Sequence, residues 1–248
     1  MVFQLRRRHC RGLHQALTCL FMRISANMLA EFILANQPER RVRLVEQVRH
    51  SVGHPLYYRA FEKPAREFLT GGARNALPLL ALIERLEGKQ GKQWHLTDAK
   101  ITIKAIRSLI AMGPQISALG VEFGPSPKRR QRLAVEGVSV SVPPHLLICR
   151  QRKGLQELGA LRFYTAQDSN GHFGVHGAQL VAAMEYLWLH QTSQEATPVA
   201  PSACMVLEVF QGRITALPED PAYLVHRVEQ GAKDFAAIWQ RLDAKSAA

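Results

Sequence analysis

Two apolar segments in the second half of the chain each carry a polar side chain that could bind a phosphate or take part in a reaction. His145 stands at the start of residues 145–150, and Arg162 lies within residues 158–165. An imidazole can transfer protons or bind a metal ion, and a guanidinium binds phosphate through its planar fork. Arg162 is equally consistent with a simple ion pair to a carboxylate on the same sheet.

The densest positive charge of the chain lies just before these segments, in a proline-rich stretch with four cations among five residues. A basic loop of this kind neutralises phosphates and makes binding strongly salt-dependent, although such a run is also typical of a solvated loop. Together with the guanidinium in the second segment, these side chains are the candidate nucleic-acid-binding residues: Lys128, Arg129, Arg130, Arg132 and Arg162.

Other catalytic patterns find little support in the sequence. His172 and His176 have the spacing of a zinc pair on a helix, but they fall in a glycine-interrupted segment that favours a polar loop. The chain contains no GxSxG, HExxH, Walker-type or GxGxxG pattern. We therefore expect no nucleophilic catalysis, no metal site and no nucleotide cofactor.

The composition is that of an ordinary globular protein with a strong positive charge. The 248 residues are 47% hydrophobic and 21% charged. Lys and Arg total 32 against 20 for Asp and Glu, which gives a formal net charge of +12. This surplus favours a polyanionic partner such as DNA or RNA, although a basic surface without such a partner has the same composition.

The cysteines and the hydropathy pattern bear on the compartment. Four cysteines lie far apart without a CxxC pair, which argues against a zinc ribbon or a disulfide framework. This pattern indicates a reducing, cytoplasmic environment. No apolar run approaches the roughly 18 residues that span a bilayer, so we expect a soluble protein with no membrane partner.

Residues 1–23 are rich in arginine and contain no acid, so we expect them to be a basic extension outside the fold. The same composition is typical of a mitochondrial presequence, which makes mitochondria the alternative location. Translation could also begin at Met22 or Met28 rather than at Met1. The first clear helix signal follows, because Ser25 can cap a helix that buries Leu29.

Residues 24–120 read as a helical region. Apolar residues recur at helical spacing in several segments, with a possible kink at Pro64. Thr97 is expected to cap a long helix that ends at Gly113. Residues 121–248 change to an alternating pattern with strands near 132–142, 145–150, 158–165 and 204–210, and with helices near 177–190 and 221–242. We therefore predict an α/β fold in which a helical N-terminal part packs on a core with one mixed sheet flanked by helices.

The order helix, three strands, helix, strand, helix resembles the PD-(D/E)xK nuclease superfamily, the restriction-endonuclease-like and RecB-like group. The resemblance rests on Pro144-His145-Leu146-Leu147-Ile148 and on Gly159-Ala160-Leu161-Arg162-Phe163-Tyr164, and it covers roughly residues 97–215. It implies a nuclease-like core for residues 121–248. It also implies a site where an Asp and a Glu hold Mg²⁺ and a Lys orients or activates the attacking water.

All three positions depart from that pattern in this chain. The resemblance assigns the Asp position to His145, the Glu position to Ala160 and the Lys position to Arg162. Imidazole is a poor ligand for Mg²⁺, a methyl group is no ligand, and a guanidinium stays protonated. His145 and Arg162 are thus degenerate counterparts of catalytic residues. We expect Mg²⁺ only if relocated carboxylates restore a site, for which the candidates are Glu136, Glu157, Glu185 and Asp168.

Three hypotheses about function follow. The first is a nucleic-acid-associated protein with a nuclease-like fold that lacks metal-dependent cleavage. The second is a non-enzymatic interaction or assembly subunit, in which Trp188 and Trp239 dock a protein partner or a second copy of the chain. The third is an active metal-dependent nuclease with relocated carboxylates.

Overall fold

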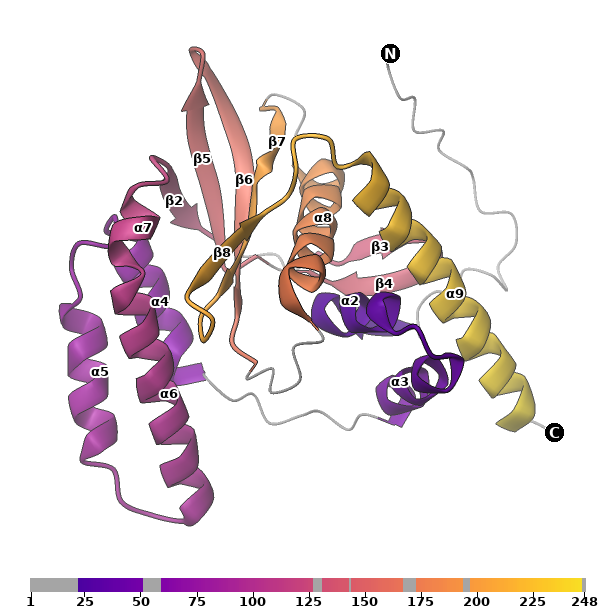
Figure 1. Ribbon diagram of the computed structural model, residues 1–248, viewed down its shortest axis with the longest axis horizontal. Helices are drawn as coiled ribbons and strands as arrows, with labels where there is room; N and C mark the ends of the chain where they lie inside the picture. The colour runs from indigo at the N-terminus through magenta and orange to yellow at the C-terminus, as the bar shows by residue number, and fades with distance from the viewer. Residues whose placement is uncertain are drawn as a thin grey trace.

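The computed structural model describes residues 22–50, 59–126, 131–142, 144–166, 173–193 and 197–246. Within them the chain forms a five-stranded sheet and a three-stranded sheet, with helices packed around both (Figure 1). The predicted α/β class with a mixed sheet flanked by helices is confirmed. The smaller sheet corrects the expectation of a single sheet.

The five-stranded sheet has the strand order β2-β5-β6-β7-β8. Neighbouring strands are antiparallel except for β6 and β7, which are parallel and are connected through helix α8. A parallel pair needs such a crossover because its strands run in the same direction. The elements span Glu122–Pro125 (β2), Leu146–Arg152 (β5), Leu155–Tyr164 (β6), Gly174–Thr192 (α8), Val199–Glu208 (β7) and Arg213–Ala216 (β8).

The three-stranded sheet joins the N-terminal part of the described chain to the predicted hairpin. Strands β3 (Leu133–Val135) and β4 (Val138–Ser141) pair across Glu136 and Gly137, whose φ angles of 46° and 78° suit a two-residue turn. Strand β1 (Arg23–Ser25) pairs in parallel with β4. The expectation that residues 1–23 lie outside the fold is therefore wrong for Met22 and Arg23, and the earlier residues are not among those described.

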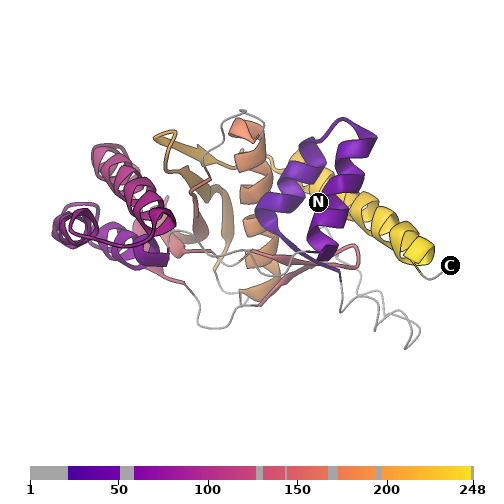
Figure 2. The same ribbon diagram turned by 90° about the horizontal axis from the view of Figure 1, so that it is seen from below.

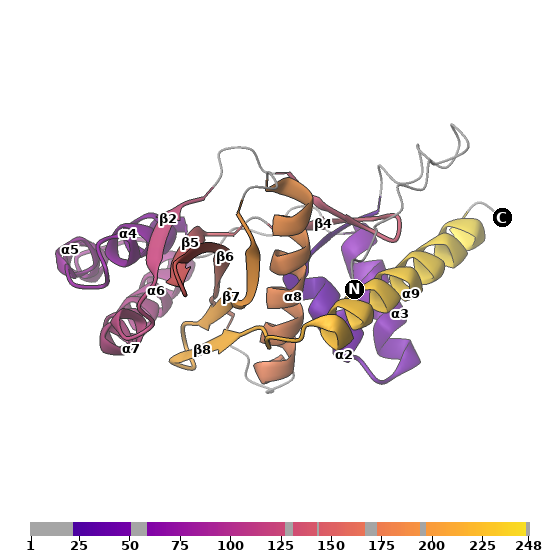
Figure 3. The ribbon, with the colours of Figure 1, turned by 90° about the horizontal axis from the view of Figure 1, so that it is seen from above.

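The five-stranded sheet separates two hydrophobic cores, with helices on both of its faces (Figures 2 and 3). The first core includes the helices α2 (Ala26–Leu34), α3 (Pro38–His50), α8 and α9 (Ala222–Ser246). The second includes α4 (Arg59–Thr70), α5 (Leu77–Glu87), α6 (Gln93–Ala111) and α7 (Gly113–Ser117). The predicted helical region 24–120 therefore contributes to two different layers and does not form one unit.

The helix signals were partly right. Ser25 caps α2, because its hydroxyl oxygen accepts a hydrogen bond from the Met28 amide at 3.2 Å. Thr97 does not cap α6, which begins at Gln93. Its hydroxyl instead donates to the Gln93 carbonyl within the helix, at 3.0 Å. Pro64 lies inside α4.

None of the helices in the described ranges is both long and apolar enough to cross a membrane.

The two tryptophans proposed as docking residues are packed within the protein. Trp188 is 2% exposed, and its indole nitrogen donates to the Gln131 carbonyl at 2.9 Å. Trp239 is half-buried against the first core and lies under the guanidinium of Arg49. Trp188 is therefore a core residue, which removes it from any docking surface.

The parallel pairing of β6 and β7 depends on the absence of a side chain at Gly159. A Cβ atom there would lie 2.2 Å from the carbonyl oxygen of Ala203, next to a shift in strand register. We predict that Gly159→Ala destabilises the protein by about 2 kcal/mol or more, because backbone atoms must move to accept the methyl group. Urea unfolding followed by circular dichroism measures the change.

Gly124→Ala is the matched control on strand β2. A Cβ atom there would meet its nearest neighbour, the Leu147 Cβ, at an ordinary 3.9 Å. Its effect should stay within about 0.5 kcal/mol. Equal stabilities for the two variants would contradict the close approach at Gly159.

Candidate functional site

His145 lies at the end of the five-stranded sheet where β5 begins, opposite β6. Its amide donates to the Leu161 carbonyl at 2.9 Å, and its Nδ1 accepts from the Phe163 amide at 3.1 Å. The ring stacks on that of Phe163, with centroids 4.6 Å apart. Its Nε2 lies 3.9 Å from the Glu62 Oε1 of α4. The imidazole is thus held in one orientation by the neighbouring strand.

The same contacts define the protonation state of His145. Burial lowers its pKa, and the neighbouring Arg162 and Arg66 add to this effect, while Glu62 opposes it. Because Nδ1 accepts a hydrogen bond, the proton of the neutral ring lies on Nε2, toward Glu62. Neither ring nitrogen then offers a free lone pair, so this histidine is poorly suited to bind a metal or to accept a proton.

Ala160 and Arg162 follow along β6 on the face that α8 covers. Ala160 is fully buried in the first core. Arg162 is of intermediate exposure with its Nε atom buried, and burial lowers the pKa of its guanidinium, while the carboxylates of Glu185 and Glu62 raise it. Arginine remains charged in proteins. The structure therefore has a partly buried cation and a methyl group at the two positions that the resemblance assigns to a Lys and a Glu.

Glu185 projects from α8 toward this cation. It is fully buried, and burial raises its pKa from 4.5 to about 8 despite the opposing effect of Arg162. Among the residues that the structure describes, no group donates a hydrogen bond to either carboxyl oxygen. Cys204 of β7 lies near enough for Glu185 to add to the rise in the thiol pKa that burial causes. Glu185 is thus a mostly protonated acid near neutral pH.

Glu62 is the fourth ionisable residue beside His145, Arg162 and Glu185, and it was not identified from the sequence. Its side chain is 42% exposed and interacts with both His145 and Arg162. It lies on α4 beside the buried stripe of Phe61, Ala65 and Phe68, where an acid reads as solvated surface. We call His145, Arg162, Glu185 and Glu62 the buried charge cluster.

The other candidates lie elsewhere or are not described. Glu157 binds Arg150 at 2.6 Å, and Glu136 lies 3.8 Å from Lys233, so neither belongs to the charge cluster. Arg132 and His176 are exposed. The candidates outside the described residues are Lys128, Arg129, Arg130, Asp168 and His172.

The cluster does not fit a magnesium ion. Mg²⁺ requires several oxygen ligands around one point, whereas here the guanidinium of Arg162 interacts with both carboxyl groups and repels a further cation. No three His, Cys, Asp or Glu side chains in the described ranges are grouped so that they could hold a metal ion. Of the described candidates for relocated carboxylates, Glu185 interacts with Arg162.

Comparisons with known proteins add no family assignment. A scan against models of protein families gives no match to this chain, and a search among curated proteins likewise finds no similar sequence.

The raised pKa of Glu185 predicts a specific pH dependence of stability. The folded state retains the proton between pH 4.5 and about 8, whereas the unfolded state loses it, so folding weakens as the pH rises through this window. The slope approaches about 1.4 kcal/mol per pH unit. Glu185→Gln removes this titration, so the variant should gain stability relative to the wild type from pH 5 to pH 9. Urea unfolding at several pH values measures the difference.

Glu208→Gln is the control for this experiment. Glu208 is also buried, but it accepts hydrogen bonds from Arg213 and from Thr215, the latter at 2.9 Å. This substitution should destabilise the protein at pH 7 by about 1–3 kcal/mol. Parallel stability curves for the wild type and Glu185→Gln would contradict a protonated Glu185.

Proposed function

We propose that this protein binds nucleic acid through phosphate contacts at the end of the five-stranded sheet where β5 begins. We propose further that it has a PD-(D/E)xK-like fold and does not cleave the bound strand with a divalent metal. The order β5, β6, α8, β7 and α9 supports the resemblance, whereas residues 132–142, its expected first strand, form the β3–β4 hairpin of the separate three-stranded sheet.

One observation carries the proposal: the residues that flank the basic stretch 127–130 lie against the first residues of β5 on both sides. Ser126 and Leu146 line one cavity of about 220 Å³, while Gln131 and Leu147 line another. The Ser126 hydroxyl donates to the Pro144 carbonyl at 2.7 Å, next to His145. Ser126 and Gln131 therefore both lie beside the residues of β5 that directly follow His145.

Further cations lie beside the same sheet end. Lys63 and Arg66 of α4 line the cavity that contains Ser126. The pair between Lys63 and Glu67 is long, at 3.9 Å, and exposed, so it contributes little to stability. We call Lys63, Arg66 and Arg132 the cationic rim. These side chains can contact phosphates without losing a strong internal partner.

The absence of cleavage follows from the donor set. Metal-assisted hydrolysis needs anionic oxygens that hold the ion and polarise the phosphate. Here the counterparts are a hydrogen-bonded imidazole, a methyl group and a guanidinium. Such a site can hold a phosphate by charge but lacks ligands to activate water.

The proposal includes DNA or RNA as partner and a reducing, cytoplasmic compartment. The described cysteines support the second point, since Cys149 and Cys204 are free thiols. Cys204 is fully buried in the first core.

The first test is binding of single- and double-stranded DNA and RNA, measured by fluorescence anisotropy across a salt series. We expect submicromolar binding at low salt that weakens steeply as salt rises. The plot of log K against log salt has a negative slope. The double variant Lys63→Gln/Arg66→Gln should reduce the magnitude of this slope by about 1.4 to 1.8, because each lost phosphate contact contributes about 0.7 to 0.9. Arg132→Gln should lower it by about half as much.

The matched control removes two charges from the connection between α5 and α6, far from the sheet (Figure 1). Lys89 and Lys92 are exposed there, so Lys89→Gln/Lys92→Gln should leave the slope nearly unchanged.

End-labelled DNA and RNA substrates incubated with the protein and Mg²⁺ or Mn²⁺ should remain intact. Salt-insensitive or undetectable binding would refute the binding proposal, and metal-dependent cleavage that Glu185→Gln abolishes would refute the loss of chemistry.

A second candidate, a protein-interaction subunit, is favoured by a different observation. Leu77 and Leu80 of α5 are 70% and 50% exposed, and Trp94 of α6 is 58% exposed. Apolar side chains of this size on one helical pair are typical of docking surfaces. Size-exclusion chromatography with light scattering tests self-association. If this face joins two copies, Leu77→Glu/Leu80→Glu should convert the dimer to a monomer.

A further inference from the structure

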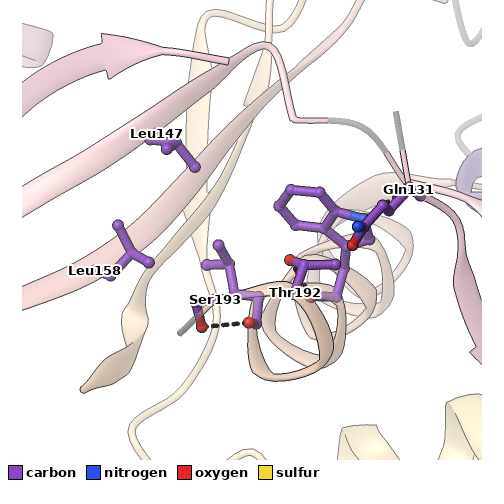
Figure 4. A pocket seen from close by; sticks show the side chains of 7 residues that line it. Gln131, Leu147, Leu158, Thr192 and Ser193 are labelled. Atoms are coloured by element: carbon purple, nitrogen blue, oxygen red, sulfur yellow. Dashed lines mark hydrogen bonds between the residues drawn. The ribbon is translucent and has the colours of Figure 1, made fainter. Parts of the chain in front are cut away.

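A cavity of about 330 Å³ lies between the β5–β6 pair and the C-terminal end of α8 (Figure 4). Leu147 and Leu158 project into it from the two strands, opposite the helix. The helix contributes the indole of Trp188 and the last side chains before the following loop. The complete lining is Gln131, Leu147, Leu158, Trp188, Leu189, Thr192 and Ser193.

The walls of this cavity are held in place by internal hydrogen bonds. The Trp188 indole donates to the Gln131 carbonyl at 2.9 Å, and this hydrogen bond fixes Gln131 against α8. The Thr192 and Ser193 hydroxyls donate to the helix carbonyls of Trp188 and Leu189. Since those hydroxyl protons are used, the two oxygens remain available as acceptors. The amide of Gln131 makes no side-chain hydrogen bond to another described residue.

We propose that this cavity binds one unpaired base of a single-stranded nucleic acid, an inference that rests on the proposed function. A nucleobase has two apolar faces and a polar edge. The aliphatic side chains of Leu147 and Leu158 match the faces, while the Gln131 amide and the two hydroxyl oxygens match the edge. A cavity of this volume is in the range of small-ligand sites and accommodates a single heterocyclic base.

The charge next to the cavity favours a nucleotide over an uncharged ligand. Arg132 is exposed and follows Gln131 directly in the chain, so it can contact the phosphate beside a bound base. Bases in a duplex are stacked and paired, and a protein reaches their faces only after extrusion. The site therefore selects single strands over duplexes.

The cavity also adjoins the buried charge cluster. Leu147 pairs in register with Ala160, two residues before Arg162 on β6. Trp188 and Leu189 follow Glu185 by about one turn of α8. A strand whose base enters the cavity therefore lies on the α8 face of the sheet, next to Arg132, whereas Lys63 and Arg66 lie on the α4 face.

The test compares two single-stranded 12-mers of equal charge: oligodeoxyadenylate and a fully abasic phosphodiester of the same length. Anisotropy at low salt should give at least about tenfold tighter binding for the oligomer with bases, because one stacked base contributes that much. Ser193→Phe fills the cavity and should abolish this difference. Gln131→Ala, at an exposed position, should reduce it severalfold.

Abasic-oligomer binding is the internal control, because a folded variant must keep it. Gln240→Ala, on the exposed face of α9, is the matched amide control and should keep the full difference. Equal affinity of the wild type for both oligomers would overturn the base site while leaving phosphate binding intact. A difference that persists in Ser193→Phe and in Gln131→Ala would also overturn it. Binding of neither oligomer would overturn the proposed function and this inference together.

Discussion

The partly buried guanidinium of Arg162, whose Nε is shielded from solvent, is the constraint around which this end of the sheet is organised. A buried cation costs several kcal/mol unless opposite charge and hydrogen bonds compensate it. The compensating carboxyl groups come from helices on the two faces of the sheet, Glu185 from α8 and Glu62 from α4. Because Glu185 is mostly protonated near neutral pH, the half-exposed Glu62 supplies much of the balancing negative charge. One side chain thus couples the positions of both helical layers.

This coupling gives the departures from the nuclease-like pattern a common physical reason. A carboxylate at Ala160 would place another acid beside Glu185 in a region from which water is excluded. A metal ion bound there would have to displace the guanidinium of Arg162. His145 is likewise committed to the Phe163 amide and to Glu62. The site is therefore consistent as an internal ion network, and in the proposed function the phosphate contacts come from its rim.

Local signals predicted the strands and turns better than the layers. The alternation of Val138 and Val140 and the Glu136-Gly137 turn defined the hairpin, and Ser25 defined the start of α2. Strands β2 and β8 were missed because each has four residues and little alternation. An apolar stripe shows that a helix face is buried but not which face of the sheet it meets, so the split of residues 24–120 between two cores was not predictable.

The candidate site shows the same contrast between what local sequence patterns predict and what only the packing of distant elements determines. His145 and Arg162 were identified from the motif positions of the resemblance, and the pairing of β5 with β6 brings them close together. Glu185 was one of several candidates, and only the docking of α8 distinguishes it from Glu136 and Glu157. Glu62 is separated from Arg162 by about 100 residues and carries no local pattern that distinguishes it from a surface acid.

The parallel pairing of β1 with β4 bears on how the chain folds as it is synthesised. Arg23 is in register with Ser139, and the first core that covers this sheet closes only with α9, near the end of the chain. The apolar side chains of α2 therefore leave the ribosome long before their partners exist. Contacts so distant in sequence slow folding and leave nascent intermediates prone to aggregation. Helix α2 therefore reaches its packed position only after α9 has been made, whereas α4, α5 and α6 can contact one another much earlier.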